Sequence, residues 1–238
     1  SDDGGRSDDV GSNPDLDTLD SDDDQQWALA AQLKRLPSRL PQEEKPMGPG
    51  PVQSLAEFEA AILEARRAPV RTVVVLHLFS GERRAGDFEQ HLTEAMSRAG
   101  LSLVVVSADL GSDASWDLSD PNTFHKIFTW AREGLLDAVI GGPPCSTWSR
   151  LRFLPGGPRP IRFREHPWGR HDASRVERRR LAEGNTLMLN FLSIAEAISM
   201  RGGAHLMEHP QDPGEDPYPS IWNTDQGQVV ETKTGAAR

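Results

Sequence analysis

The 238-residue chain contains one cysteine, and the residues before it are unusual. Cys145 follows Gly141-Gly-Pro-Pro144, where two consecutive prolines remove two backbone donors and restrict the main chain. A cysteine that serves only as a small apolar core residue needs no such rigid support. A nucleophilic thiol does need it, because its attack depends on a fixed direction. We therefore predict that Cys145 is a catalytic nucleophile.

The most basic segment of the chain begins soon after this cysteine. Residues 150–180 contain ten arginines against three acidic residues, and three aromatic side chains lie among them. Arginines with interleaved aromatic rings are typical of surfaces that contact phosphates and stack on bases. A solvated basic loop is the alternative interpretation. The candidate nucleic-acid contacts are Arg150, Arg152, Arg162, Arg164 and Arg170.

Other residues with chemical potential follow predicted strands, as Cys145 does. They are the turn Phe79-Ser80-Gly81, the carboxylate of Asp109 and the carboxylate of Glu208. In open parallel sheets, ligands bind beyond the carboxyl ends of the strands. Each residue alone has an ordinary interpretation as a tight turn or a cap. Their shared position predicts one site that holds an aromatic ring, a thiol and two carboxylates.

Buried strands and amphipathic helices alternate along the chain. Continuous apolar runs predict strands at 72–78, 101–106, 136–140 and 204–207. Capping residues and 3.6-residue periodicity predict helices that begin after Ser54, Asp87 and Asp120, and a longer helix over 181–200. This alternation predicts an α/β fold with a Rossmann-like, doubly wound, mainly parallel sheet and right-handed crossovers. The last thirty residues show no pattern that we can assign.

The helix predicted after Asp87 has apolar residues at helical spacing, and we expect them to face the core. They are Phe88, Leu92, Ala95, Met96 and Ala99.

Composition divides the chain into two parts. Residues 1–52 are acidic and then proline-rich, which predicts a disordered tail, and residues 53–238 form the predicted catalytic domain. The first 24 residues carry ten Asp and one Arg, a charge of −9, so the rest of the chain sums to only −1 of the total −10. No apolar run is long enough to span a membrane. The single cysteine fits a reducing, intracellular compartment, which would be the nucleus in a eukaryotic cell.

These residues together resemble the cytosine-C5 DNA methyltransferases over residues 73–210. His77-Leu-Phe-Ser-Gly81 resembles the first motif of that family, Gly142-Pro-Pro-Cys145 its nucleophile motif, and Glu208 the glutamate that contacts the target cytosine. The resemblance implies a class I methyltransferase fold, S-adenosylmethionine as cofactor, and DNA or RNA as partner. It also implies a set of cofactor-binding residues, namely Phe79, Ser80, Gly81, Asp109, Asp117 and Pro143.

The resemblance implies a covalent mechanism as well. The thiolate of Cys145 would attack C6 of cytosine, and C5 would then take the methyl group. Glu208 would hydrogen-bond N3 of the base and stabilise the developing charge. The base must leave the duplex to reach such a pocket.

The chain also departs from the family pattern. His77 stands where many members have Asp, and Glu208 is followed by His-Pro in place of Asn-Val. The interval between Cys145 and Glu208 is long because of the arginine-rich segment. We expect no target-recognition domain after Glu208, so a catalytically inactive nucleic-acid-binding remnant of a mobile-element protein is the main alternative.

The residues around Cys145 and Glu208 also allow two other enzyme classes. His205-Leu-Met-Glu208-His209 matches a zinc-peptidase pattern, but that chemistry needs both histidines on one helical face, and we predict a strand here. We therefore expect no metal site. A Cys–His hydrolase would pair Cys145 with His205 or His209, but it leaves the Phe-Ser-Gly turn and Asp109 unexplained.

Overall fold

The computed structural model describes residues 54–234. The tail predicted for residues 1–52 lies outside the described residues.

The centre of the described fold is a four-stranded, all-parallel sheet. Its strands lie in the order β2-β1-β3-β4, and their bounds are Thr72–Leu78 for β1, Ser102–Ala108 for β2, Ala138–Gly141 for β3 and Ala204–Met207 for β4. The predicted strands 72–78 and 204–207 are confirmed to the residue, and the other two are shifted by one or two positions. The expected α/β fold with a parallel sheet is therefore confirmed.

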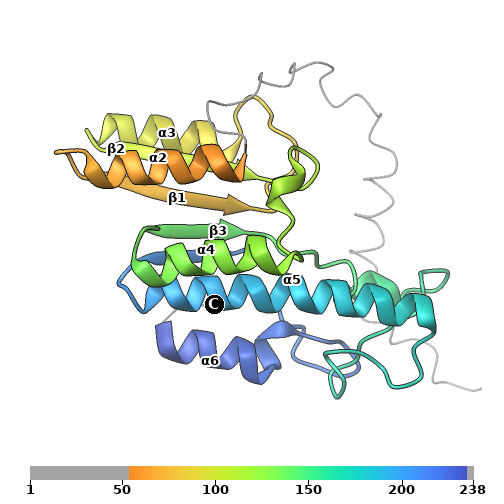
Figure 1. Ribbon diagram of the computed structural model, residues 1–238. Helices are drawn as coiled ribbons and strands as arrows, with labels where there is room; N and C mark the ends of the chain where they lie inside the picture. The colour runs from red at the N-terminus through yellow and green to blue at the C-terminus, as the bar shows by residue number, and fades with distance from the viewer. Residues whose placement is uncertain (1–53, 235–238) are drawn as a thin grey trace, which may run out of the picture. The chain divides into compact units, whose positions relative to one another are not determined.

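Helices cover both faces of this sheet. The bounds are Leu55–Arg67 for α2, Phe88–Arg98 for α3, Pro121–Glu133 for α4, Arg175–Ser199 for α5 and Asp225–Thr234 for α6. Figure 1 shows α2, α4 and α5 on one face and α3 on the other, with α6 beside α5. Three short 3₁₀ turns lie between these elements, at Ala114–Trp116, Arg150–Phe153 and Ile221–Asn223.

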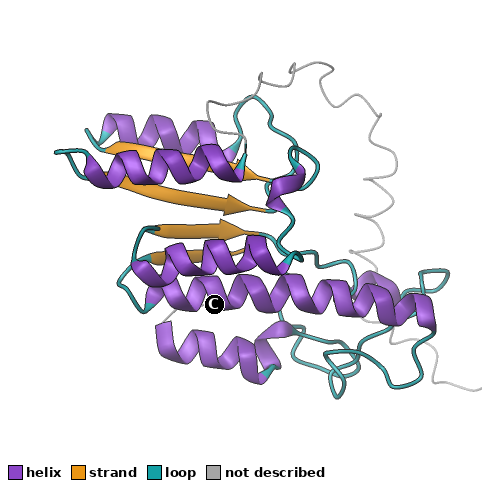
Figure 2. Cartoon of the chain, viewed as in Figure 1, coloured by secondary structure: helices purple, strands orange, loops and turns teal. Residues whose placement is uncertain are grey.

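The strand order explains why α3 lies apart from α4 and α5. The chain passes from β1 to β2 in one direction and then returns past β1 to β3 and β4. Right-handed crossovers in opposite directions place their helices on opposite faces of a sheet. The carboxyl ends of all four strands therefore meet at one edge, which Figure 2 shows facing the long loops between β3 and α5.

The predicted helix caps are confirmed at three positions. Ser54 and Glu57 form a reciprocal capping box at α2, Asp87 accepts a hydrogen bond from the backbone of Gln90, and Asp120 caps α4 ahead of Pro121. Each cap satisfies a backbone donor that the first helical turn leaves unpaired.

The predicted start of the long helix at Leu181 was wrong. Helix α5 begins at Arg175, because Ser174 and Glu177 form a second capping box. The Ser-x-x-Glu spacing at 174–177 was the sequence signal for this start. Its consequence is that the last four arginines of the basic segment lie on a helix and not in a loop.

The predicted apolar face of α3 was right only in part. Phe88, Leu92 and Met96 are half-buried, whereas Ala95 and Ala99 are exposed. The only buried residue of α3 is Glu89, at 7% exposure. Arg83 pairs with this carboxylate, and the backbone of Ser107 donates to it over 2.9 Å, so a charged group takes the place of an apolar one.

An ion pair fixes the start of the sheet. Arg66 of α2 donates to the carboxylate of Asp137 over 2.8 Å and to the carbonyl of Leu135 over 2.8 Å. The same Asp137 oxygen accepts from the backbone of Val74 in β1 over 2.8 Å. One carboxylate thus joins α2, β1 and the chain that enters β3, and it is only partly exposed, while the exposed Arg71 lies 3.9 Å from its other oxygen.

We predict that Asp137→Ala lowers the free energy of unfolding by about 2–3 kcal/mol, because it removes hydrogen bonds to a charged group and leaves the Arg66 cation without its carboxylate partner. The control is Glu59→Ala, which breaks a more exposed pair with Lys126 and should cost about 1 kcal/mol or less. Chemical denaturation measures both variants. Equal losses would contradict the role assigned to Asp137.

Candidate functional site

Cys145 and Glu208 follow neighbouring strands at the carboxyl edge of the sheet. Strands β3 and β4 pair so that Gly141 lies opposite Met207, and the backbone of Glu208 donates to the carbonyl of Gly141 over 2.9 Å. A Cβ atom placed on Gly142 would lie 3.0 Å from Oε2 of Glu208. The carboxylate of Glu208 therefore lies against the start of the Gly-Pro-Pro-Cys turn.

The turn that carries the thiol is fixed by a buried proline before Cys145 and by a backbone hydrogen bond after it. Pro143 is buried, Pro144 is exposed, and the backbone of Trp148 donates to the carbonyl of Cys145 over 2.8 Å. Trp148 itself is buried at 1% exposure. Cys145 is half-buried and free, so the thiol is neither sealed in the core nor on an unsupported loop.

The turn after β1 and the end of β2 are joined by Asp109. Its two carboxylate oxygens accept from the backbone of Gly81 over 2.9 Å and of Gly111 over 2.8 Å. The backbone of Ser80 donates to the carbonyl of Ala108 over 3.4 Å. The Phe-Ser-Gly turn and Asp109 are therefore brought together, as their positions after adjacent strands predict.

Phe79 has a strained backbone. Its φ of 57° is the only positive value among the non-glycine residues that the structure describes. Such a conformation costs roughly 1–3 kcal/mol and tends to occur where function requires it. The ring is half-buried, and its centre lies 6.4 Å from that of Phe191 in α5.

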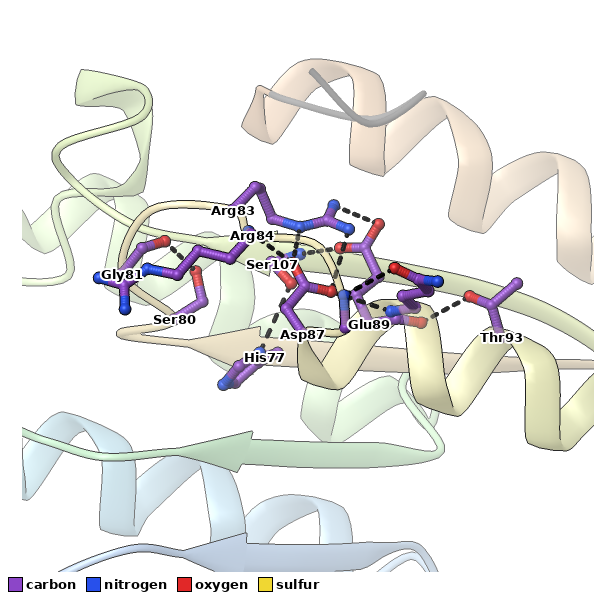
Figure 3. A network of polar contacts seen from close by, with 11 residues as sticks. His77, Ser80, Gly81, Arg83, Arg84, Asp87, Glu89, Thr93 and Ser107 are labelled. Atoms are coloured by element: carbon purple, nitrogen blue, oxygen red, sulfur yellow. Dashed lines mark hydrogen bonds and ion pairs between the residues drawn. The ribbon is translucent and has the colours of Figure 1, made fainter. Parts of the chain in front are cut away.

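A charged network supports the segment after this turn (Figure 3). Arg83 pairs with both Asp87 and Glu89, which belong to the start of α3. His77 of β1 contacts Ser107 of β2, with 3.5 Å between Nδ1 and the hydroxyl, and burial is the main cause that lowers the pKa of His77. The sequence interpretation missed this network, although the Arg-x-x-x-Asp spacing at 83–87 is visible in the sequence.

Asp117 is engaged locally. Its Oδ1 accepts from the backbone of Ser119 over 2.9 Å and from its hydroxyl over 2.6 Å, and these bonds lower the pKa of Asp117. The next residue, Leu118, accepts from Asn190 of α5 over 2.9 Å. Asp117 therefore shapes the turn ahead of α4, and no described contact joins it to Asp109.

Arg162 differs from the other predicted arginines because it does not lie on the surface. Its side chain is fully buried, at 0% exposure, and its guanidinium lies 4.2 Å from the centre of the Trp148 ring. Burial, with a smaller contribution from the Arg152 cation, lowers the pKa of Arg162 to about 9. The Arg162 guanidinium therefore lies behind the surface and not on it, and sequence alone could not distinguish it from its neighbours.

The other four predicted arginines lie nearer the surface and have different partners. Arg150 is exposed over the ring of Tyr218, and Arg152 donates to the carbonyl of Ser146 over 2.7 Å. Arg164 pairs with Asp212, and Arg170 pairs with Asp172. Two of the four are thus partly neutralised within the chain.

The two histidines near Glu208 have separate surroundings. His205 lies in β4, where its Nδ1 lies 2.8 Å from the hydroxyl of Ser199. His209 lies between Trp148 and Trp222, with ring centres 5.6 and 6.3 Å away. The helix that a zinc peptidase requires is absent at β4, and neither histidine is described in contact with Cys145. Among residues 54–234, no group of three His, Cys, Asp or Glu side chains is placed to hold a metal ion.

Comparisons with protein-family models, with curated proteins and with solved structures find no match to this chain. Within the part of the chain that the structure describes, no helix combines the length and the apolar character needed to cross a membrane.

We predict a pH dependence of stability from His209. Burial is the main cause that lowers its pKa to about 4, while the Pro210 backbone raises it and the Arg162 cation lowers it further. An unfolded histidine, with a pKa of 6.5, binds a proton at a higher pH than the folded one. The stabilisation is therefore complete above pH 6.5 and decreases as pH falls toward 4, by at most about 1.4 kcal/mol per pH unit.

Denaturation of the wild type and of His209→Phe across this pH range measures the effect. The variant should show a flatter dependence, and a variant of exposed His125 controls for the loss of one titratable ring. An identical slope in wild type and His209→Phe would contradict the prediction.

Proposed function

We propose that this protein transfers a methyl group from S-adenosylmethionine to C5 of cytosine in DNA, through a covalent bond between Cys145 and the base. The observation that supports this most is the position of Glu208, whose carboxylate lies against Gly142 at the start of the Gly-Pro-Pro-Cys turn. A thiol and a carboxylate that follow adjacent strands can act on one planar ring, the thiol from its face and the carboxylate at its edge.

The residues present fit the proposed cofactor. S-adenosylmethionine supplies an electrophilic methyl group when it is bound. The carboxylate of Asp109, placed beside Gly81, is in the position where this architecture holds ribose hydroxyls. Phe79, Ser80, Gly81 and Pro143 would surround the rest of the cofactor. Both Ser119 bonds reach Oδ1 of Asp117, so Oδ2 is the atom that would accept from the adenine amino group.

The protein side chains carry the remaining chemistry. The thiolate of Cys145 forms a bond to C6, and the electron pair of the C5–C6 double bond becomes available at C5 for the methyl group. Glu208 holds N3 and the amino group of the base, which stabilises the charge that develops on the ring. Removal of the C5 proton by a base then restores the double bond and releases the thiolate, so Cys145 is regenerated.

The cytosine must leave the duplex before Cys145 can reach C6. The arginine-rich segment supports binding of the phosphate backbone, through the exposed Arg150 and Arg180. The same chemistry would act on cytosine in RNA. A DNA substrate would place the protein in the nucleus of a eukaryotic cell.

We predict that the protein forms a covalent adduct with an oligonucleotide that contains 5-fluorocytosine, in the presence of the cofactor. Fluorine replaces the C5 proton, so the thiolate cannot be released and the complex survives denaturation. Mass spectrometry should detect the mass of the protein plus the methylated oligonucleotide. Cys145→Ser should give no adduct, and Glu208→Gln should form it about 10²–10⁴ times more slowly.

Duplex DNA and single-stranded RNA carrying the same base distinguish the two substrates. A protein that methylates cytosine without forming an adduct would contradict the role of Cys145. A protein that binds DNA, but neither binds the cofactor nor forms an adduct, would support the inactive nucleic-acid-binding alternative.

A second prediction concerns the cofactor residues. Asp109→Asn should weaken binding of S-adenosylhomocysteine by about 10–100-fold, because hydrogen bonds to a charged group contribute about 1.5–3 kcal/mol. The matched control is Asp113→Asn, whose carboxylate accepts from the backbone of Ser115 in the same segment. Isothermal titration calorimetry measures both variants. Equal affinities for the two would argue against a ribose contact at Asp109.

A further inference from the structure

A pocket with both polar and apolar walls lies directly beside the turn that carries Cys145. Its volume is about 280 Å³, and it opens between that turn and the first half of α5. The turn contributes Ser146 and Thr147, the following segment contributes Arg152, and α5 contributes Arg180, Glu183 and Gly184. The pocket is separate from the Asp109 side of the site, and none of the proposed catalytic steps uses it.

A buried and unsatisfied donor lies behind this pocket. Nε of Arg162 donates to the hydroxyl of Thr147 over 2.8 Å, and Nη1 donates to the carbonyl of Pro167 over 2.7 Å. The side chain is fully buried, and its third nitrogen, Nη2, has no hydrogen-bond partner. A buried donor that lacks a partner costs about 1–3 kcal/mol, so an acceptor that reached it would be bound favourably.

Gly184 is the residue that lies between the pocket and this donor. A Cβ atom at this position would lie 3.4 Å from Nη2 of Arg162 and 3.8 Å from the hydroxyl oxygen of Thr147. Glycine is otherwise unfavourable in the interior of a helix, by about 1 kcal/mol relative to alanine. Gly184 therefore has no side chain that would stand between the pocket and both polar groups.

The charges around the pocket favour an anion. Arg152 lies close enough to both Arg180 and Arg162 for their cations to interact. Burial first, and then the Arg180 cation, lowers the pKa of Arg152, and the Arg152 cation contributes to the lowered pKa of Arg162. The charged residues that line the pocket are thus Arg152, Arg180 and Glu183, which leaves one positive charge in excess, and the buried Arg162 cation lies behind them. The hydroxyl of Thr147 accepts from Arg162 and keeps its own proton for another acceptor.

We propose that this pocket binds one phosphate group of the nucleic-acid backbone, next to the target nucleotide. A phosphate offers several acceptor oxygens at once, which matches converging guanidinium groups and a hydroxyl donor. The inference rests on the proposed function, because only a nucleic-acid substrate would bring a phosphate beside Cys145. It adds that the substrate is held from the α5 side of the turn.

The experiment measures binding of a fluorescent DNA duplex to the full chain as a function of salt. Arg180→Gln should weaken binding about eight-fold at 0.1 M salt and reduce the salt slope by about 0.9, the value for one lost phosphate contact. The matched control is Arg179→Gln, the neighbouring exposed residue of α5, which does not line the pocket. It should change the slope by less than half as much.

Gly184→Ala tests the same pocket without changing the charge. The added methyl group would cover Nη2 of Arg162, and binding should weaken about ten-fold, the factor for one lost hydrogen bond to a charged group. Alanine favours the helix, so thermal unfolding should show a stability no lower than that of the wild type.

Several outcomes would overturn the inference or separate it from the proposed function. The phosphate site would be overturned if Arg180→Gln and Gly184→Ala bind DNA as tightly as Arg179→Gln does. This holds whether or not the 5-fluorocytosine adduct forms. Loss of binding to a polyglutamate peptide in these variants, with DNA binding unchanged, would overturn the nucleic-acid assignment. Weaker DNA binding in both variants, in a protein that forms no adduct, would support the phosphate site and reject the methyltransferase.

Discussion

The parallel pairing of β3 with β4 is the constraint on which the candidate site depends. This register places Gly141 opposite Met207, so the residues that follow both strands begin their loops side by side. The bond from the Glu208 backbone to the Gly141 carbonyl continues the ladder one step beyond the sheet. A shift of the pairing by one residue would turn every side chain of β4 to the other face, and the carboxylate of Glu208 would leave the Pro-Pro-Cys turn.

The other half of the edge is organised by charge. Asp109 accepts from two backbone donors in separate loops, and the pairs that Arg83 makes with Asp87 and Glu89 join the segment after Gly81 to α3. These contacts hold Phe79 in a conformation that a free chain would avoid. The energy of this strain is supplied by the surrounding contacts, which is consistent with a site prepared before any ligand arrives.

Much of the fold could be predicted from the sequence, because local signals agree with the global arrangement. The buried strands are continuous apolar runs, and Ser54, Asp87 and Asp120 mark helix starts by cap chemistry alone. The predicted start of α5 was wrong because the arginine-rich composition of this segment is typical of a loop, whereas the Ser174–Glu177 capping box begins the helix inside it. The position of Glu89 could not be predicted, since a charged residue is buried only where a distant part of the chain brings a partner.

The candidate site was less predictable than the fold. Which residues follow the strands could be inferred from order along the chain, and Asp109, Cys145 and Glu208 lie at the expected edge. Which arginines reach the surface could not be inferred, because burial of Arg162 depends on a ring and two acceptors elsewhere in the chain. The pocket at Gly184 likewise arises only when α5 packs against the turn after Cys145.

The buried guanidinium of Arg162 affects how the basic segment, residues 150–180, would bind a large ligand. Through Thr147, Trp148 and Pro167 it ties this segment to the interior, so much of its surface is already ordered in the unbound chain. A segment that is ordered in advance loses little conformational entropy when it associates. A large ligand would therefore bind a preformed surface here, and the segment would not have to fold around it.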